Sequence, residues 1–210
     1  MGIRVILCDD HALIRRGIRD TLSDVQDIEV VGEAGDYGEL RSLLRGTACD
    51  VLVLDINMPG RSGLDVLQVL KDEGNPIKVL VVSMHPEDQY AIRALRAGAY
   101  GYVNKGSDTQ LLVSAVRMVA QGRKYITPEI AQMLAESLTQ PAAAAAHEKL
   151  SDRELQTLVL IASGRRLSDI ATELTLSPKT VSVYRARVLE KLGLSNNSEL
   201  TVYAIRNGLV

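Results

Sequence analysis

The 210-residue sequence predicts an α/β domain, a doubly wound five-stranded parallel sheet, followed by an all-α domain of four short helices. Over residues 1–122, short β-branched runs alternate with segments of helical spacing, which is typical of repeated βα units. Beyond residue 147 only helical patterns occur. Residues 1–122 hold 13 basic and 17 acidic side chains, whereas residues 147–210 hold 9 and 7. The formal net charge of −2 therefore combines an acidic domain with a basic one.

Five short apolar runs predict the strands. Several lack the alternation of apolar and polar residues that a half-exposed strand shows, so they fit parallel strands covered on both faces. The expected strands are Ile3–Leu7, Ile28–Ala34, Val51–Leu54, Val79–Val82 and Gly101–Val103.

Apolar residues at helical spacing lie between and after these strands. Five βα repeats within about 120 residues predict the doubly wound topology. The residues that carry the helical spacing are Leu13, Ile14, Ile18 and Leu22, then Leu64, Leu67 and Leu70, and finally Leu111, Ala115 and Val119 beside Leu112, Val116 and Ala120.

Residues 123–147 are predicted to connect the two domains. A helix is expected over Pro128–Leu138, and Pro141 breaks its continuity within the segment TQPAAAAAHEK. Five alanines offer little side chain to bury, although alanine favours helix. We therefore interpret this stretch as a linker with some helical character.

The second domain, residues 148–210, is predicted to hold four helices joined by tight turns. The turns contain Gly164, Ser177 and Gly193. The expected helices are Asp152–Ser163, Leu167–Leu174, Pro178–Leu192 and Asn197–Asn207.

The composition disfavours several classes of protein. Seven Tyr without Phe or Trp argue against a protein that stacks nucleic-acid bases on several aromatic rings. Cys8 and Cys49 lie in apolar runs without metal-ligand spacing, so we interpret them as two buried structural thiols. No apolar run approaches the length of a membrane span, and MGIRVILCDD soon reaches acidic residues. We therefore expect a cytoplasmic protein with no membrane partner.

Polar residues gather where four predicted strands end, and in a doubly wound sheet ligands bind beyond these carboxyl ends. Three converging carboxylates call for a cation, and oxygen ligands with room for water suit Mg²⁺. With a lysine and a hydroxyl beside them, Asp55 is the natural nucleophile for an aspartyl phosphate. The strand-end residues are Asp9 and Asp10, then Asp55 and Asn57, then Ser83, and finally Lys105.

The first 122 residues resemble the receiver domain of two-component response regulators, through the segments CDDHALIRRGI, VLVLDINMPGRSGLDVL, VLVVSMH and GAYGYVNKG. The resemblance implies that Asp55 accepts phosphate from the phosphohistidine of a sensor histidine kinase. It also implies that Asp9 and Asp10 hold Mg²⁺ with Asp55 and the backbone carbonyl of Asn57, that Ser83 and Lys105 contact the phosphoryl oxygens, and that Tyr102 is an aromatic switch following the Ser83 hydroxyl.

Each of these residues has an ordinary structural interpretation when taken alone; Tyr102, for example, fits a core tyrosine with a hydrated hydroxyl. Their joint occurrence at four strand ends, in order, favours the functional interpretation. Gly106 departs from the receiver pattern, because many receivers have proline there, and it leaves the loop after Lys105 less constrained. His11 is interpreted as a surface or packing residue.

The helix over Pro178–Leu192 is predicted to begin firmly, because Ser177 is a good N-cap and Pro178 suits the first helical position. One side of this helix is expected to pack against Ile170, Ala171 and Leu174. The residues on that side are Val181, Tyr184, Val188 and Leu192.

The second domain resembles the LuxR-type helix-turn-helix domain over LSDRELQTLVLIASGRRLSDIATELTLSPKTVSVYRARVLEKLGLSNNSEL, and the whole chain looks like a NarL/FixJ-type transcriptional regulator. By this resemblance Pro178–Leu192 is the recognition helix for the major groove of duplex DNA, and Asn197–Asn207 pairs two domains on DNA. The base-edge candidates are Ser182, Val183 and Ala186, and the phosphate candidates are Lys179, Thr180, Arg185 and Arg187.

Three positions depart from the LuxR-type pattern. Many relatives have Lys in place of Ser182, His in place of Tyr184, and a Ser or Thr cap in place of Arg166. Ser182 and Val183 are weak readers of base sequence, so contacts to the DNA backbone and DNA shape are expected to carry more of the specificity.

These features predict a transcription regulator switched by phosphorylation. Phosphate on Asp55 is expected to change the face formed by Asp88–Gly98, Gly101–Val103 and the last receiver helix. A homodimer would then present two helix-turn-helix domains to a two-fold or tandem DNA site. RNA polymerase is a further expected partner, and no enzyme activity is expected beyond self-phosphorylation and autodephosphorylation at Asp55.

Two alternatives remain at this point. A regulator that senses a ligand or acts without phosphorylation is disfavoured by the intact set of Asp9, Asp10, Asp55 and Lys105. A Mg²⁺-dependent phosphohydrolase of the haloacid dehalogenase type usually wants a second acid where this chain has Asn57.

Overall fold

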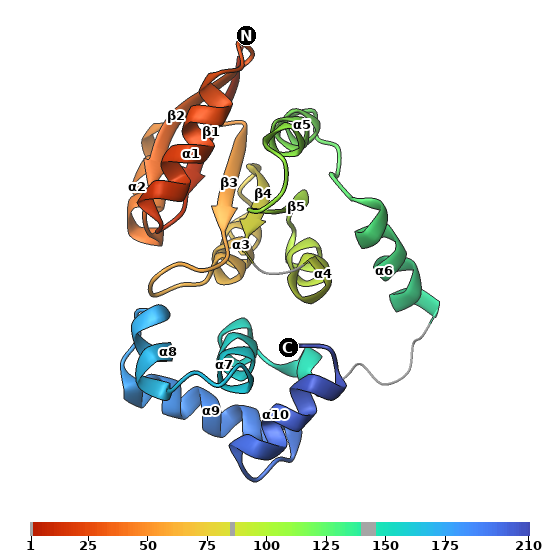
Figure 1. The fold of residues 1–210 in the computed structure, drawn as a ribbon. Helices are drawn as coiled ribbons and strands as arrows, with labels where there is room; N and C mark the ends of the chain where they lie inside the picture. The colour runs from red at the N-terminus through yellow and green to blue at the C-terminus, as the bar shows by residue number, and fades with distance from the viewer. Residues whose placement is uncertain (1, 85–86, 140–145) are drawn as a thin grey trace. The chain divides into compact units, whose positions relative to one another are not determined.

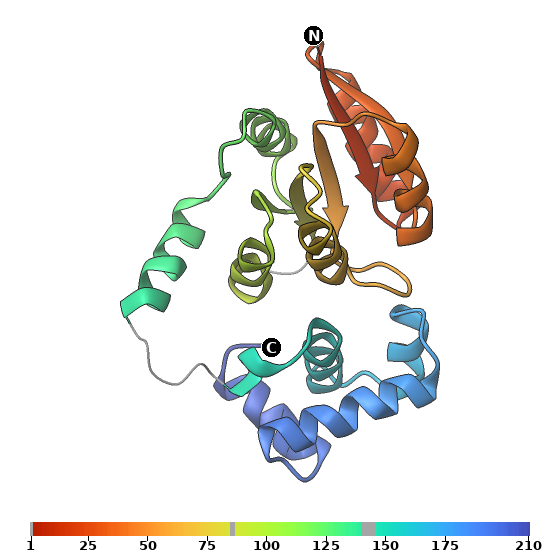
Figure 2. The same ribbon diagram turned by 180° about the vertical axis from the view of Figure 1, so that it is seen from behind.

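The computed structural model describes residues 2–84, 87–139 and 146–210. The chain divides after Glu136 into two compact units, and each is described by itself. Figures 1 and 2 show the chain from opposite sides. The first unit contains a parallel sheet with helices, and all the elements described in the second are helices, so the predicted fold class is confirmed.

Five parallel strands form the sheet in the order β2-β1-β3-β4-β5. The chain winds away in opposite directions from β1 and β3, which makes the carboxyl ends of this pair the switch point of the sheet. Four strands run one residue past their predicted ends, so Asp55 and Ser83 are the last residues of β3 and β4. The bounds are β1 Ile3–Cys8, β2 Ile28–Ala34, β3 Val51–Asp55, β4 Lys78–Ser83 and β5 Gly101–Asn104.

Helices cover both faces of the sheet, which explains why most strands are apolar without alternation (Figure 1). Val5 and Val53 pack on the face of α1 and α5, in one cluster with Leu112 of α5. Ile6 points to the opposite face, where it approaches Leu43 of α2 across Gly32. The helices of this unit are α1 Ala12–Ser23, α2 Tyr37–Gly46, α3 Gly63–Asp72, α4 Glu87–Ala97 and α5 Thr109–Ala120. Helix α6, Pro128–Thr139, crosses the division after Glu136.

Helical spacing did not single out α2 or α4. The first is largely exposed and fully buries only Leu40, so its apolar signal is short. Its start is nevertheless encoded locally, because the side chain of Asp36 accepts a hydrogen bond from the backbone N–H of Glu39.

The chain that leaves α5 returns to the edge of the sheet before α6 begins. The backbone N–H of Tyr125 donates to the carbonyl of Tyr100 at 2.8 Å, and Tyr125 forms a parallel bridge with Gly101 of β5. A Cβ at Gly101 would lie 2.8 Å from the Cβ of Tyr125, so this close approach needs glycine. Helix α6 then follows as predicted, whereas the linker interpretation of residues 140–145 falls outside the described residues.

The second unit contains the four predicted helices and one short helix that was not predicted. The unpredicted 3-10 helix η1 leads into α7, and the backbone N–H of His147 donates to Tyr203 Oη at 3.2 Å. Ser177 caps α9 as predicted, and Gly193 ends it in the left-handed conformation at φ 65°. The bounds are η1 Ala146–Lys149, α7 Asp152–Ala162, α8 Leu167–Glu173, α9 Pro178–Leu192 and α10 Asn197–Arg206.

The packing side of α9 differs from the prediction at three positions. Val181 and Val188 are fully buried, but Tyr184 and Leu192, which the spacing places on the same side, are only half-buried. Leu189 is buried instead. The contact side of α9 is therefore rotated toward Leu189, because the helix packs against α7 as well as α8.

Both cysteines are free thiols. Cys8 is buried, with its Sγ 3.2 Å from Met58 Sδ, whereas Cys49 is only half-buried, which corrects the expectation of two buried thiols. Among the residues that the structure describes, no helix combines the length and apolar character that a membrane crossing requires.

Candidate functional sites

The carboxyl ends of β1, β3, β4 and β5 bring the predicted strand-end residues to one edge of the first unit. We call this group the acidic rim; it consists of Asp9, Asp10, Asp55, Asn57, Ser83 and Lys105. Asp55 and Ser83 end neighbouring strands, and the backbone N–H of Lys105 donates to the carbonyl of Ser83 at 2.8 Å. Asp9, Asp55 and Ser83 are each at most 2% exposed. A polar group this buried requires specific partners, so the contacts of each carboxylate define the site.

Lys105 lies between two of these carboxylates. Its Nζ is 2.7 Å from Asp9 Oδ2 and 2.8 Å from Asp55 Oδ2, and the side chain is only 3% exposed. One ammonium group neutralises one of the two negative charges. The remaining charge is held in a buried position, where Coulomb interactions are strong.

The environment raises the pKa of Asp55 to about 6. Burial is the largest cause, and the negative charge of Asp9 acts in the same direction. Lys105 and the backbone N–H of Asn57 oppose this rise through charge and hydrogen bonding. Because the resulting pKa lies below neutrality, the Asp55 carboxylate is mainly ionised, and able to act as a nucleophile, at neutral pH.

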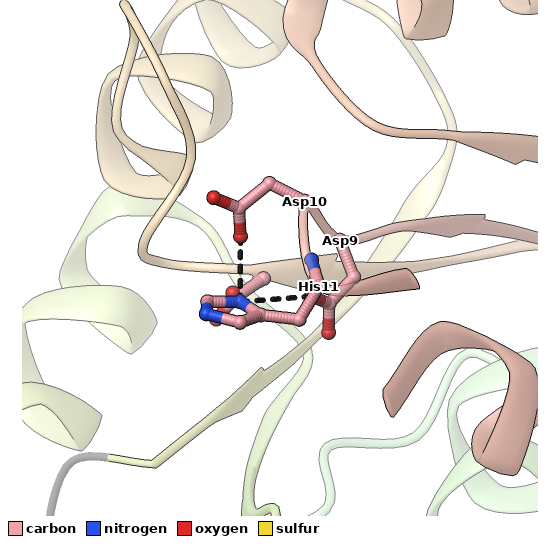
Figure 3. Close-up of side chains that lie close together, drawn as sticks. Asp9, Asp10 and His11 are labelled. Atoms are coloured by element: carbon pink, nitrogen blue, oxygen red, sulfur yellow. Dashed lines mark hydrogen bonds and ion pairs between the residues drawn. The ribbon is translucent and has the colours of Figure 1, made fainter. Parts of the chain in front are cut away.

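A further carboxylate and an imidazole complete the cluster. Ligand atoms of Asp9, Asp10, His11 and Asp55 all lie within 4.8 Å of one another. His11 Nδ1 is 2.7 Å from Asp10 Oδ1 and 3.6 Å from Asp9 Oδ1, and the ring is 59% exposed (Figure 3). His11 is thus a rim residue paired with Asp10.

The donor set fits a magnesium ion. Three carboxylates and one lysine leave a formal charge of −2 when His11 is neutral, which a divalent cation balances. Oxygen ligands gathered around partly open space are what Mg²⁺ prefers. The residues that would hold it are Asp9, Asp10, Asp55 and the backbone carbonyl of Asn57.

Tyr102 lies on β5 and is fully buried. Its backbone pairs with Val81 of β4, two residues before Ser83. The proposed switch side chain therefore occupies a buried position in the strand that leads to Lys105.

Two residues that shape the acidic rim were not found from the sequence. Gly63 begins α3, and its backbone N–H donates to the carbonyl of Ile56 at 2.8 Å. A Cβ there would lie 2.1 Å from the backbone oxygen of Asp55, so only glycine fits. Arg15 donates to the backbone carbonyl of Asp9. Gly63 stands in the turn-like segment PGRSG, which was a usable signal, whereas Arg15 resembles any basic residue of a surface helix.

In the second unit, α9 exposes a small and basic face. The half-buried Thr180 is close to its N-cap, with Oγ1 2.8 Å from Ser177 Oγ. Arg185 is also half-buried, and its Nε donates to Asn197 Oδ1 of α10 at 2.5 Å. The exposed DNA-binding candidates are Lys179, Ser182, Val183, Ala186 and Arg187.

Lys191, near the end of α9, has a structural partner. Its Nζ lies 2.6 Å from Oε2 of Glu154, a carboxylate on α7 that is 2% exposed. Burial alone would raise the pKa of Glu154, but hydrogen bonds from Lys191 and the backbone of Ser151 hold it below its usual value. Lys191 thus stabilises the core of the unit. At the start of α8, Arg166 occupies the N-cap position without a side-chain cap bond, as its departure from Ser or Thr predicted.

Two family models match the chain. Residues 5–117 match the response regulator receiver domain. Residues 148–204 match the bacterial regulatory proteins of the luxR family. The first match contains the whole acidic rim and the second contains α9.

Relatives extend over nearly the full length of the chain. Response regulator UvrY of Escherichia coli strain K12 is 40% identical over 208 residues, covering 99% of this chain and 95% of the relative. Response regulator GacA of Pseudomonas protegens is 41% identical over 210 residues, covering 99% and 98%. RcsB of Salmonella enterica serovar Typhimurium, solved bound to promoter rprA with the phosphomimetic BeF3-, has a TM-score of 0.65 and 26% identity, covering 97% of this chain and 98% of RcsB.

Proposed function

The chain belongs to the NarL/FixJ-type response regulators, which join a receiver to a LuxR-type DNA-binding domain, and on this premise we propose that Asp55 is its phosphoacceptor. As a member of this family the chain is a phosphorylation-dependent transcription regulator. The contact that best supports the assignment is Lys105 between Asp9 and Asp55, at 2.7 and 2.8 Å. It places the buried Asp55 carboxylate, the proposed nucleophile, beside the ammonium group of Lys105, which can bind a phosphoryl oxygen.

In the proposed reaction, an Asp55 carboxylate oxygen attacks the phosphorus of a phosphohistidine on the sensor kinase. A P–O bond forms and the P–N bond breaks, and the electron pair of that bond stays on the departing imidazole. Lys105 and the hydroxyl of Ser83 contact the phosphoryl oxygens. Bound Mg²⁺ would supply charge neutralisation, held by Asp9, Asp10, Asp55 and the carbonyl of Asn57. The same groups support self-phosphorylation from small donors and autodephosphorylation.

Tyr102 is proposed to respond to this change through Ser83. A phosphoryl group that engages the Ser83 hydroxyl alters the space beside β5, where Tyr102 lies buried. The altered face would include α4 and β5 and would promote homodimer formation. Two DNA-binding units held together bind two half-sites with an affinity that neither reaches alone.

We propose α9 as the recognition helix for duplex DNA. Its exposed middle is small, which suits entry into the major groove, and basic side chains flank it. Arg185 is proposed as a phosphate contact whose guanidinium is oriented by Asn197. The remaining proposed phosphate contacts are Lys179, Thr180 and Arg187, and the proposed base contacts are Ser182, Val183 and Ala186.

We propose domain boundaries that follow these roles: a receiver over residues 1–122, a connecting helix and linker over 123–147, and a DNA-binding domain over 148–210. The family matches to residues 5–117 and 148–204 support this division. Because the proposed target is DNA, we propose that the protein acts in the cytoplasm. RNA polymerase is a further proposed partner.

A direct test uses acetyl phosphate and Mg²⁺ with the full chain. We expect intact-mass spectrometry to show one added phosphoryl group on the wild type and none on Asp55→Asn. Analytical ultracentrifugation of the same samples should show a larger dimer fraction only for the phosphorylated wild type. Equal mass and equal dimer fraction in both proteins would refute the assignment.

A further inference from the structure

We propose that Arg15 is a positioning residue for the metal site, holding the Asp9–Asp10 turn in the geometry that a divalent cation needs. The proposal rests on the function assigned above to the acidic rim. It adds a residue from α1 that does not itself ligate metal or contact the phosphoryl group.

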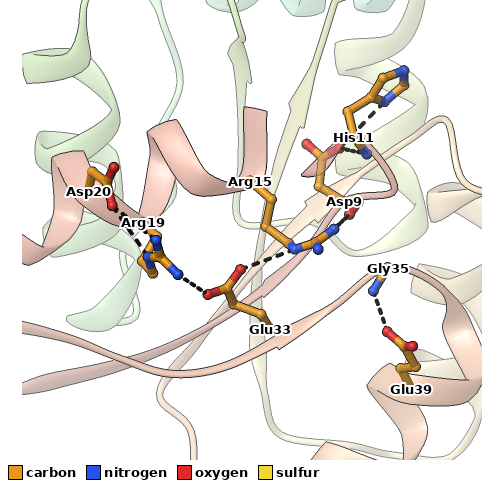
Figure 4. Close-up of polar contacts among 8 residues, drawn as sticks. All are labelled: Asp9, His11, Arg15, Arg19, Asp20, Glu33, Gly35 and Glu39. Atoms are coloured by element: carbon orange, nitrogen blue, oxygen red, sulfur yellow. Dashed lines mark hydrogen bonds and ion pairs between the residues drawn. The ribbon is translucent and has the colours of Figure 1, made fainter. Parts of the chain in front are cut away.

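The guanidinium of Arg15 joins two elements (Figure 4). Its Nη1 donates to the backbone carbonyl of Asp9 at 2.5 Å, and its Nε donates to Glu33 Oε2 of β2 at 3.1 Å. The side chain is 20% exposed, so it lies mostly within the structure. Arg15 therefore fixes the end of β1 relative to the edge strand β2.

Asp9 depends on this contact because each of its other polar groups has a different task. Its backbone N–H donates to the carbonyl of Ala34 at 3.0 Å. Its Oδ1 accepts from the backbone N–H of His11 at 2.9 Å, and its Oδ2 pairs with Lys105 at 2.7 Å. The contact from Arg15 adds the backbone carbonyl to this set. The peptide group between Asp9 and Asp10 is then held in one orientation. This orientation fixes the position of the Asp10 α-carbon, from which its carboxylate side chain extends.

Glu33 is itself held from both sides. Its Oε1 accepts from Arg19 Nη1 at 3.0 Å while its Oε2 accepts from Arg15. Glu33 also directly precedes Ala34, whose carbonyl binds the N–H of Asp9. The backbone N–H and the carbonyl of Asp9 are thus both held against the same end of β2. The N–H binds Ala34 directly, and the carbonyl is linked to Glu33 through Arg15. Residues that orient metal ligands in this way commonly change metal affinity by about 10- to 100-fold.

Whether substitution of Arg15 weakens or strengthens metal binding distinguishes a positioning role from an effect of its charge alone. A guanidinium near a cation site repels a divalent ion, so removing its charge alone would strengthen metal binding. Loss of positioning weakens it. The Arg15–Glu33 pair is partly exposed and contributes little to global stability, so the fold is expected to survive substitution.

The experiment measures binding of Mg²⁺ to the full chain by isothermal titration calorimetry, and of Mn²⁺ by electron paramagnetic resonance. The test variants are Arg15→Met, which keeps the aliphatic stem, and Arg15→Lys, which keeps the charge without the forked geometry. Arg19→Met is the matched control, since Arg19 contacts Glu33 but not Asp9. We expect both Arg15 variants to raise the Kd about tenfold, and the control to stay within about twofold of wild type.

A second readout does not depend on metal. Hydrogen exchange of the His11 amide reports the bond from that amide to Asp9 Oδ1, and it should accelerate in Arg15→Met but not in Arg19→Met. If Arg15→Met does not fold, Glu33→Gln tests the same link from its other end. It should raise the Kd in the same direction, because the guanidinium loses its anchor.

The outcomes are distinguishable. Unchanged or tighter metal binding in Arg15→Met, or full recovery in Arg15→Lys, would overturn the positioning role while leaving the phosphoacceptor assignment intact. If wild-type protein binds neither Mg²⁺ nor Mn²⁺, the metal site of the proposed function fails first, and the role of Arg15 fails with it.

Discussion

The α-carbon of Gly63 lies so close to the main chain of Asp55 that a Cβ on it would be 2.1 Å from the Asp55 carbonyl oxygen. The contact brings the start of α3 against the end of β3 and closes the loop that contains Asn57. The position of the nucleophile thus depends on the absence of a side chain eight residues later.

Substitution of this glycine should be costly. We expect Gly63→Ala to lower the free energy of unfolding by about 3 kcal/mol, because rigid backbone must move to admit the methyl group. Urea unfolding of the full chain measures the change. Gly17→Ala is the control: it lies within α1, its Cβ meets no described atom within 4 Å, and it should be neutral or slightly stabilising. Equal stability of the two variants would contradict the close approach.

Asp55 should destabilise the fold at neutral pH. Its pKa is raised from 3.8 to about 6, so the folded chain binds a proton more tightly than the unfolded chain does. The stability that this proton provides is present below pH 3.8 and disappears as the pH rises through about 6. In metal-free buffer, Asp55→Asn should therefore have a higher Tm than wild type at pH 7.5, with the gap closing near pH 4. A lower Tm at both pH values would contradict the raised pKa.

Lys191 should matter for stability and not for DNA affinity. Replacing it with Met leaves the buried Glu154 carboxylate without its cationic partner, at a cost of about 2 kcal/mol. Because the pKa of Glu154 is lowered, its contribution to stability is present above its unfolded pKa and disappears as the pH falls through the folded value. The stability difference between wild type and Lys191→Met should therefore shrink under acid. Chemical unfolding at pH 7 and pH 3.5 measures both effects, and an equal difference at the two pH values would exclude this ion pair as the cause.

The exposed cations of α9 should behave in the opposite way. Lys179→Ala and Arg187→Ala are each expected to weaken DNA binding for all sequences and to reduce the slope of log affinity against log salt by about one. Fluorescence anisotropy over a salt series measures the slope. Stability should be unchanged, and Lys191→Met should retain the wild-type slope. A slope that Lys191→Met lowers as much as Lys179→Ala would place the DNA surface elsewhere.

Complete burial made some elements easy to predict, but it was not required, since β2 and α1 are only partly buried and were predicted as well. Strands such as β3 are covered on both faces, so their apolar runs are unambiguous, and the residues that follow them fall at one rim by topology alone. Helix α2 was not singled out because its leucines, Leu40, Leu43 and Leu44, extend over little more than one helical turn. Tyr184 and Leu189 show the same limit on α9, where helical spacing gives an apolar side but not the direction of its neighbours.

The supporting residues of the acidic rim were harder to predict than its reactive ones. Asp55 and Lys105 could be predicted because a carboxylate and a lysine that follow neighbouring strand ends, beside further carboxylates, indicate a site for a phosphoryl group and a cation. Arg15 and Gly63 act through backbone atoms of Asp9 and Asp55, and no sequence pattern records which carbonyl a side chain will meet. Such contacts become visible only when the strands and helices are placed in space.

The bridge between Tyr125 and Gly101 attaches the segment before α6 to β5. This strand carries Tyr102 and leads directly to Lys105, and the chain on its way to α6 is hydrogen-bonded to the residue before Gly101. The segment that leads to α6 and on to the second unit is therefore attached to the edge of the sheet at Tyr125. Only Ile126 and Thr127 separate Tyr125 from α6, so we expect a movement of β5 to shift the start of α6 as well.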